Sequence, residues 1–276
     1  MSMSAADAPI GVFDSGVGGL SVLRAIRAEL PAEDLLYVAD SGYAPYGERD
    51  AGFIEDRAAA IAGFLLDEGV KAIVVACNTA TVVAIEKLRA WCPLPVVAIE
   101  PAIKPAARIT RSGVVGVLAT RQTLASANVA RLCAAYGQDI EILLQPCPGL
   151  VEQVENAELD SPATRALLET YLAPLLAAGA DTIVLGCTHY PFLLPLVRDI
   201  VGPERAIIDP ATAVAKELAR RLGNQRATAL RPARTRFLSS AAGGRANAVV
   251  SALWGCPVEV EPVQANRNHR LVPAAG

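Results

Sequence analysis

Short apolar runs that alternate with longer helical patterns are the feature that most constrains the fold of this chain. The runs are rich in Val and Ile and are apolar throughout, which is typical of strands buried on both faces of a parallel sheet. Helical patterns lie between them, for example at 20–30 and 53–68. This alternation predicts an α/β fold with helices on both sides of the sheet. We expect strands at 10–13, 35–39, 72–76, 95–99, 113–118, 140–144, 182–186 and 206–208.

The same local pattern occurs twice along the chain. In the unit that begins IGVFDSG, Cys77 follows Asp14 by 63 residues, and in the unit that begins VGVLATRQT, Cys187 follows Thr120 by 67. The similar spacing predicts two related α/β domains, each with a cysteine at the carboxyl end of a strand, where ligands bind in open α/β sheets. We place the active site in the cleft between the domains. The predicted bounds are 1–100 with 212–276 for the first domain and 101–211 for the second, with the Pro-rich segment 100–107 as a crossing.

Composition and charge argue against several other classes of protein. Hydrophobic residues make up 53% of the 276 positions, which predicts a folded chain, yet no run approaches the roughly 20 apolar residues of a membrane helix. The N-terminal MSMSAADAP lacks the basic and apolar parts of a secretory signal, so we expect a cytoplasmic protein. The net charge of −3 does not indicate nucleic-acid binding. We interpret the basic stretch 220–237 as solvated surface, with contact to an acidic partner as the alternative.

The cysteines and histidines do not have the spacing of a structural zinc site. The chain has two histidines and no C-x-x-C pair, and cytosolic cysteines are normally reduced thiols. We therefore expect neither a metal nor disulfides. The six cysteines are Cys77, Cys92, Cys133, Cys147, Cys187 and Cys256.

Two of these cysteines stand in matching contexts. VVACNTATV contains Cys77 and VLGCTHYPF contains Cys187, each after an apolar run and before polar donors. A strand end beside a helix N-terminus favours the thiolate, and Asn78, Thr79 and Thr188 are suited to hold a substrate carboxylate. Either cysteine alone is more often a small buried hydrophobe. The repetition favours a reaction that uses both thiols.

The glycine-rich FDSGVGGLS does not fit a nucleotide-binding loop. Ser21 stands where the third glycine of a dinucleotide fingerprint is needed, and no Gly-Lys-Ser/Thr follows. Two interpretations remain: a plain strand-to-helix turn, or a turn whose Asp14 and Ser15 face a ligand. His189 directly follows Cys187-Thr188, so we weigh a catalytic aid against a packing histidine, and Asp14 is the equivalent candidate for Cys77.

We predict a loop at 39–50, ADSGYAPYGERD, in which Pro45 and Gly47 fix the turn. The alternative for this segment is a plain turn with Tyr46 packed on the surface. The loop alone therefore does not distinguish a binding segment from a connection.

Four motifs together resemble the glutamate racemases, of the cofactor-independent aspartate/glutamate racemase superfamily. FDSGVGGLSVL, PYGER, ACNTAT and GCTHYPFL occur in the family order, from about residue 10 to 215, while residues 225–276 match only loosely. In ATRQT, Ala119 stands where the family usually has Gly. The resemblance implies interconversion of L- and D-glutamate without a cofactor, supplying D-glutamate for peptidoglycan synthesis. Glutamate is then the expected small-molecule partner, and a homodimer is left open.

The resemblance also assigns roles to residues. It implies that Cys77 and Cys187 are the acid/base thiols, with Cys77 taking the proton from D-glutamate and Cys187 from L-glutamate. Asp40 and Glu152 match acidic positions of the family whose role is less settled. Thr120 and Thr123 fit as carboxylate-binding candidates. The implied substrate contacts are Asp14, Ser15, Tyr46, Gly47, Asn78, Thr79, Thr188 and His189.

Three other functions compete with this interpretation. An aspartate racemase would use the same chemistry on a shorter substrate. A pyridoxal-dependent racemase would need a Schiff-base lysine, and a non-catalytic sensor would keep the pocket without the reaction. None of the four lysines lies in a recognisable cofactor motif: Lys71, Lys87, Lys104 and Lys216.

Overall fold

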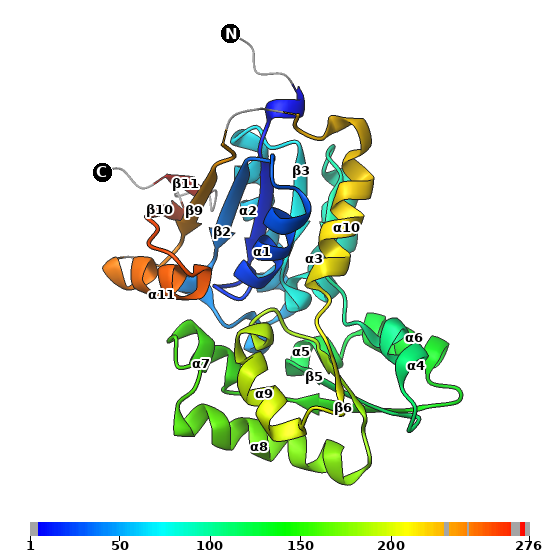
Figure 1. Ribbon diagram of the computed structural model, residues 1–276. Helices are drawn as coiled ribbons and strands as arrows, with labels where there is room; N and C mark the ends of the chain where they lie inside the picture. The colour runs from blue at the N-terminus through cyan, green and yellow to red at the C-terminus, as the bar shows by residue number, and fades with distance from the viewer. Residues whose placement is uncertain (1–4, 229–231, 242, 266–270, 274–276) are drawn as a thin grey trace.

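The computed structural model of the protein describes residues 5–228, 232–241, 243–265 and 271–273. Two β-sheets, each covered by helices, form two domains that lie one above the other in Figure 1. The predicted α/β fold with two mostly parallel sheets is confirmed. In the described part of the chain, no helix has the length and apolar character needed to cross a membrane.

The seven-stranded sheet of the first domain has the order β11-β10-β9-β2-β1-β3-β4. All of its strand pairs are parallel except β10 with β11. Its strands are β1 (Ile10–Asp14), β2 (Leu35–Ala39), β3 (Ala72–Val75), β4 (Val96–Ala98), β9 (Thr235–Ser239), β10 (Val260–Ala265) and β11 (Leu271–Pro273). Its helices are α1 (Leu20–Glu29), α2 (Ala51–Asp67), α3 (Asn78–Trp91), α10 (Ala211–Leu222) and α11 (Gly244–Trp254). Its single-turn 3-10 helices are η1 (Ala5–Asp7), η2 (Ser41–Tyr43), η3 (Tyr46–Glu48) and η5 (Gly223–Gln225).

The four-stranded, all-parallel sheet of the second domain has the order β6-β5-β7-β8. Its strands are β5 (Val114–Ala119), β6 (Glu141–Pro146), β7 (Thr182–Leu185) and β8 (Ala206–Ile208). Its helices are α4 (Ile103–Ile109), α5 (Arg121–Leu124), α6 (Ala127–Tyr136), α7 (Leu150–Glu155), α8 (Pro162–Ala177), η4 (Tyr190–Leu193) and α9 (Leu194–Val201).

The two sheets share one order of strands. In the first sheet β2-β1-β3-β4 are neighbours, and in the second β6-β5-β7-β8 repeat that arrangement. β1 therefore corresponds to β5, and β3 corresponds to β7. The internal repeat expected from the spacing of the cysteines is thus present in the topology. The domain bounds given above stay a prediction.

Burial explains why these segments form their elements. All five residues of β1 are buried, as a strand covered on both faces requires. Helix α2 begins where the Asp50 side chain accepts a hydrogen bond from the Phe53 amide, and the chain leaves it at Gly69, whose φ is +73°. One apolar core continues from the α1 side of the first sheet into the α8 side of the second. The domains are therefore packed against each other through this shared core and are not joined by a linker alone.

The C-terminal segment returns to the first domain, and here the sequence interpretation was incomplete. Strand β9 lies between β2 and β10, so the end of the basic stretch 220–237 is inside the sheet, with Phe237 buried. Arg236 stays exposed near the start of the strand, and it pairs with Glu261 and Glu68. Positions 229–231 of this stretch and 1–4 of the N-terminal segment lie outside the described residues.

Candidate active site

Cys77 and Cys187 stand at corresponding points of the two domains. Cys77 lies just after β3 and directly precedes α3, and Cys187 lies just after β7. Both side chains are buried, with 4% and 6% of their surface exposed. Burial and the Asp14 charge are the main causes that raise the pKa of Cys77, and the charge on Cys187 adds to them. The segments after β3 and β7 bring these residues to the interface between the domains.

The glycines of the FDSGVGG loop make room for side chains of the second domain. A Cβ atom at Gly16 would overlap the Glu155 carboxylate, and one at Gly18 would overlap the His189 ring. The loop is therefore a close-contact surface between domains as well as a strand-to-helix turn. Its composition follows from the side chains that it must accommodate.

The first thiol belongs to a chain of hydrogen bonds that we call the Cys77 relay, formed by Cys77, Ser15 and Asp14. The Cys77 thiol donates to Ser15 Oγ at 3.4 Å, and Ser15 Oγ donates to Asp14 Oδ1 at 3.1 Å. The amide of Ala80 in the first turn of α3 donates to Cys77 Sγ at 3.4 Å. Asp14 was predicted to assist Cys77, and its connection to that thiol passes through the Ser15 hydroxyl.

Burial and charge keep this relay in its protonated thiol form. Burial, together with the nearby Asp14 carboxylate, raises the pKa of Cys77 to about 12. Burial also raises the pKa of Asp14, although the charge of His189 and the hydrogen bond from Thr188 act in the opposite direction. Cys77 is therefore a proton donor in the resting protein.

The second thiol belongs to the Cys187 relay, formed by Cys187, His189 and Glu155. Cys187 Sγ lies 3.7 Å from His189 Nδ1, and His189 Nε2 lies 2.7 Å from Glu155 Oε1. The carboxylate of Glu155 also accepts hydrogen bonds from the first domain, from the Val17 amide at 2.7 Å and from Ser41 Oγ at 3.0 Å. This relay is therefore completed by the opposite domain.

His189 is held in its charged form. Burial opposes the charge, but hydrogen bonds to Cys187 and Glu155 more than offset it and hold the pKa of His189 well above its usual value. The imidazolium thus offers a donor to the Cys187 sulfur. Of the two interpretations left open for His189, the packing histidine fits this geometry less well, because both ring nitrogens contact ionisable partners.

Thr188 joins the two relays. Its hydroxyl donates to Asp14 Oδ2 at 2.7 Å, and its carbonyl accepts a hydrogen bond from Ser21 Oγ at 2.9 Å. The Thr188 hydroxyl, a predicted substrate contact, is therefore already occupied by Asp14. The residue that broke the dinucleotide pattern, Ser21, fixes the segment that follows Cys187.

A second group of polar side chains has unused hydrogen-bonding capacity. Asn78 is 2% exposed, and within the described part of the protein neither its Nδ2 nor its Oδ1 has a partner. Beside it along the chain, Thr79 lies 3.0 Å from Thr120 and 3.3 Å from Thr123, hydroxyl to hydroxyl, and Thr120 lies 3.0 Å from Thr123. A buried amide without a partner is costly unless a ligand satisfies it. These groups therefore form a candidate cradle for a carboxylate.

The 41–49 loop reaches the same region. Gly47 lies against Thr120, since a Cβ atom at Gly47 would come 2.9 Å from Thr120 Cβ. Tyr46 is 1% exposed, so the alternative of a tyrosine packed on the surface is wrong. Its hydroxyl donates to the fully buried Asp40 at 2.5 Å, so Asp40 holds the loop from inside the first domain.

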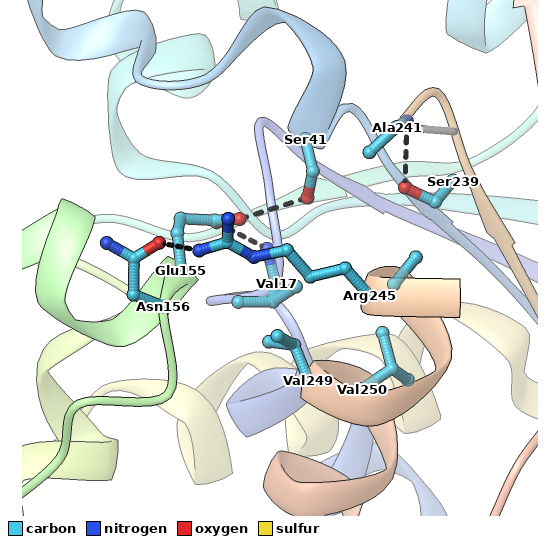
Figure 2. A pocket seen from close by; sticks show the side chains of 10 residues that line it. Val17, Ser41, Glu155, Asn156, Ser239, Ala241, Arg245, Val249 and Val250 are labelled. Atoms are coloured by element: carbon cyan, nitrogen blue, oxygen red, sulfur yellow. Dashed lines mark hydrogen bonds between the residues drawn. The ribbon is translucent and has the colours of Figure 1, made fainter. Parts of the chain in front are cut away.

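Sequence reasoning missed Glu155, which lies one helical turn from the predicted Glu152. Glu152 lines a different hollow of about 30 Å³, together with Gly47, Thr120 and Arg121. Glu155 instead forms one wall of a pocket of about 260 Å³ between α7 and α11 (Figure 2). Arg245 of α11 reaches across that pocket to Asn156, the neighbour of Glu155. The run VEQVE offered two carboxylates three positions apart, and only the orientation of α7 decides which one meets His189.

The described residues contain no cluster of three or more His, Cys, Asp or Glu side chains that could hold a metal ion. The chemistry of the site is carried by thiols, carboxylates, hydroxyls, an amide and one imidazole. Such groups bind and release protons.

Comparisons with known proteins agree on one family. Residues 10–218 match the Asp/Glu/Hydantoin racemase family. The chain is 54% identical to the glutamate racemase of Ectopseudomonas mendocina, over 94% of this chain and 99% of that protein. It is 52% identical to the glutamate racemase of Pseudomonas aeruginosa, over 94% and 98%.

Solved structures give the same result. The Escherichia coli glutamate racemase in complex with L-glutamate and the activator UDP-MurNAc-Ala superposes with a TM-score of 0.83 at 33% identity, over 92% of this chain and 97% of that one. The Francisella tularensis enzyme in complex with D-glutamate gives 0.82 at 28% identity, over 94% and 98%. The match of family, length and fold shows that this chain belongs to the Asp/Glu/Hydantoin racemases, in the branch of the glutamate racemases.

Proposed function

We propose that the protein interconverts L- and D-glutamate by a two-base mechanism in which Cys77 and Cys187 act on opposite faces of the α-carbon. The observation that carries the proposal is the matched pair of thiols after β3 and β7, each in a relay that ends in a carboxylate. The relatives named above as glutamate racemases support the choice of substrate.

A racemase must remove the α-proton from one face and return a proton to the other. A single base would have to cross the plane of the carbanion, whereas two thiols on opposite faces need not move. In the L-to-D direction Cys187 takes the proton and Cys77 supplies one, and the roles reverse from D-glutamate. The raised pKa of Cys77 suits it to the donor role in the first direction. The two thiols supply both proton transfers, so no cofactor is required.

The α-proton is far less acidic than a thiol, so the developing negative charge needs stabilisation. We assign the α-carboxylate to the cradle of Asn78, Thr79, Thr120 and Thr123, whose donors are fixed before the substrate arrives. Preorganised donors in a site closed to water stabilise such charge strongly. The unpartnered amide of Asn78 supports this assignment.

We assign the side-chain carboxylate to Ser15 and the backbone near Tyr46 and Gly47. His189 was also predicted to contact it, but its two ring nitrogens are engaged by Cys187 and Glu155, so we assign His189 to the Cys187 relay. A charged group left without its partner in such a site is costly, so glutamine and the shorter aspartate should both be poor substrates. This separates the proposal from an aspartate racemase. Similar kcat/KM values for aspartate and glutamate would contradict it.

Two lysines fit structural roles better than a pyridoxal Schiff base. The ammonium of Lys71 is buried against Glu33 at 2.6 Å and against the carbonyls of Ala6 and Gln225. Lys87 pairs with Glu55. A non-catalytic sensor would not need two relays around its thiols. We further propose, from the family resemblance, a cytoplasmic enzyme whose D-glutamate enters peptidoglycan synthesis.

Deuterium labelling tests the two-base mechanism. In heavy water the thiol that delivers the new proton carries deuterium. Early in a reaction that starts from L-glutamate, deuterium should appear in D-glutamate and hardly at all in the remaining L-glutamate, as measured by mass spectrometry after separation of the enantiomers. A single shuttling base would label both pools from the start, and that result would exclude the proposal.

A further inference from the structure

Asp40 carries a buried charge that neither relay uses. Its side chain is fully buried, and Arg57 of α2 holds both carboxylate oxygens, with Nε 2.8 Å from Oδ2 and Nη2 2.7 Å from Oδ1. The guanidinium also stacks on the ring of Tyr43, with 3.8 Å between the guanidinium carbon and the ring centroid. Such a two-pronged, stacked contact fixes a carboxylate in orientation as well as in position.

The third partner of Asp40 is the Tyr46 hydroxyl, which donates to Oδ2 at 2.5 Å. The ring of Tyr46 packs edge-on against Phe53, and Tyr43 also contacts Phe53. Arg57 and Asp40 thereby attach both 3-10 turns of the 41–49 loop to helix α2. The contact to η2 is the stacked Tyr43 ring, and the contact to η3 is the Tyr46 hydroxyl.

The loop in turn forms a contact across the domain interface. Gly47 follows Tyr46 directly and lies against Thr120. Thr120 belongs to the hydroxyl cradle, the name we give to Thr79, Thr120 and Thr123 of the carboxylate cradle. Turn η3 packs on α5 and α3, the helices that carry Thr123 and Thr79. A continuous series of contacts therefore runs from Arg57 through Asp40 and Tyr46 to the cradle.

We propose that Arg57 and Asp40 are positioning residues that set the affinity for glutamate, by holding the Tyr46–Gly47 turn against the hydroxyl cradle. Tyr46 serves through its backbone, because its hydroxyl is turned inward to Asp40. The proposal rests on the proposed function and names residues that determine substrate binding at that same site.

A buried ion pair is a poor source of stability, since removing two charges from water offsets most of their attraction. Such a pair does fix the orientation of the two side chains that form it. The same domain contains a second buried ion pair, Glu33 with Lys71 at 2.6 Å, which lies before β2 and β3 at the amino ends of the strands. The two pairs are similar in burial and lie at opposite ends of the sheet, so the pair far from the site is a matched control.

The test compares Tyr46→Phe, Arg57→Lys and the control Glu33→Gln with the unmodified enzyme. The kcat and KM for both glutamate enantiomers are measured by circular dichroism, and folding is checked by thermal melts. Tyr46→Phe removes only the hydroxyl that Asp40 holds. It should raise KM for both enantiomers on the order of tenfold, with kcat nearly unchanged, because ordering of the turn then opposes binding. Arg57→Lys keeps the charge but not the stacked fork, and a smaller rise in KM is expected.

Glu33→Gln should lower the melting temperature and leave both kinetic constants unchanged. If KM stays at its original value in Tyr46→Phe and Arg57→Lys, or if kcat falls while KM does not, the positioning proposal is overturned. An equal rise of KM in Glu33→Gln would also overturn it, since the effect would then follow stability. Absence of racemisation by the unmodified enzyme would instead refute the proposed function.

Discussion

The Cys77 relay and the Cys187 relay have the same layout but different middle groups. Each begins with a thiol after a corresponding strand and ends in a carboxylate, yet a hydroxyl connects Cys77 to Asp14 and an imidazole connects Cys187 to Glu155. The Asp14 carboxylate helps to raise the pKa of Cys77, whereas the imidazole beside Cys187 is held in its charged form. Two related domains supply matched geometry, while the local residues give each thiol a different resting environment.

The largest effect that would test this comparison comes from removing either thiol. Cys77→Ala and Cys187→Ala should each abolish racemisation of both enantiomers, because one face of the substrate then lacks its acid or base. Polarimetry or circular dichroism with glutamate measures the loss. Cys147→Ala is the matched control, since Cys147 is also a buried thiol but donates to the Gln145 carbonyl and belongs to neither relay. A Cys77→Ala enzyme that works near its original rate would end the two-thiol account.

The next effect distinguishes the two relays by direction. Asp14→Asn and His189→Asn should each slow turnover by about 10²–10⁴-fold, the range of general acid/base assistance. The enantiomers have equal free energy, so kcat/KM must be the same in both directions for every variant and cannot reveal an asymmetry. Primary isotope effects can reveal such an asymmetry. With α-deuterated substrates, each variant should show a larger primary isotope effect from one enantiomer than from the other.

The enantiomer with the larger isotope effect should switch between the two variants, because each substitution weakens a different thiol. Ser15→Ala removes the bridge between Cys77 and Asp14 together with a proposed contact to the side-chain carboxylate. It should show the same isotope asymmetry as Asp14→Asn, with a smaller loss of about tenfold. Equal isotope effects from both enantiomers in all three variants would remove the assignment of one relay to each direction.

A smaller effect concerns the ionisation of Cys77. Burial comes first and the Asp14 charge second in raising the pKa of this thiol to about 12, so Asp14→Asn should lower that pKa. Thiolate absorbance at 240 nm between pH 7 and 10 measures it, taken as the difference between each enzyme and the same enzyme with Cys77→Ala. At pH 10 the difference should be larger in Asp14→Asn than in the parent enzyme. An unchanged titration would mean that burial alone determines the pKa of Cys77.

The smallest expected effect is on stability, and its sign differs between the relays. The folded pKa of His189 lies above the unfolded value of about 6.5, so the stability it contributes is complete below that pH and is lost as pH rises through the folded pKa. The folded pKa of Asp14 is also raised, so its ionised form at neutral pH opposes folding. Asp14→Asn should therefore raise the melting temperature at pH 7 by roughly one to a few degrees, and His189→Asn should lower it at pH 6. Shifts of the same sign would contradict this account.

The sequence predicted all of the first eight strands and the strand-end position of both thiols, because buried parallel strands and strand-end motifs are encoded locally. The short β4 and β8 were recognised by their apolar runs as readily as β1. Strands β9, β10 and β11 were missed because TRFLS and VEPVQA mix polar with apolar residues and LVP has only three residues. The pairing of β9 with β2 joins segments that are far apart in the sequence.

The missed functional residues share a physical reason. Glu155 was passed over for Glu152 because the run VEQVE does not specify which carboxylate of α7 faces the other domain. Arg57 lies in a helical pattern where an arginine is normally solvent-exposed, and it is buried only because Asp40 meets it from the end of β2. Roles that depend on contacts between distant elements cannot be read from the elements one at a time.

The space left by the glycines of the FDSGVGG loop determines how closely the two domains approach each other. The Glu155 carboxylate and the His189 ring fill the volumes where Cβ atoms of Gly16 and Gly18 would stand. Side chains of the second domain therefore occupy the space that these glycines of the first domain leave. Glu155 also accepts hydrogen bonds from the Val17 amide and the Ser41 hydroxyl, so the Cys187 relay is complete only where the two domains are in contact. A methyl group on either glycine would overlap Glu155 or His189 and would act as a wedge between the domains.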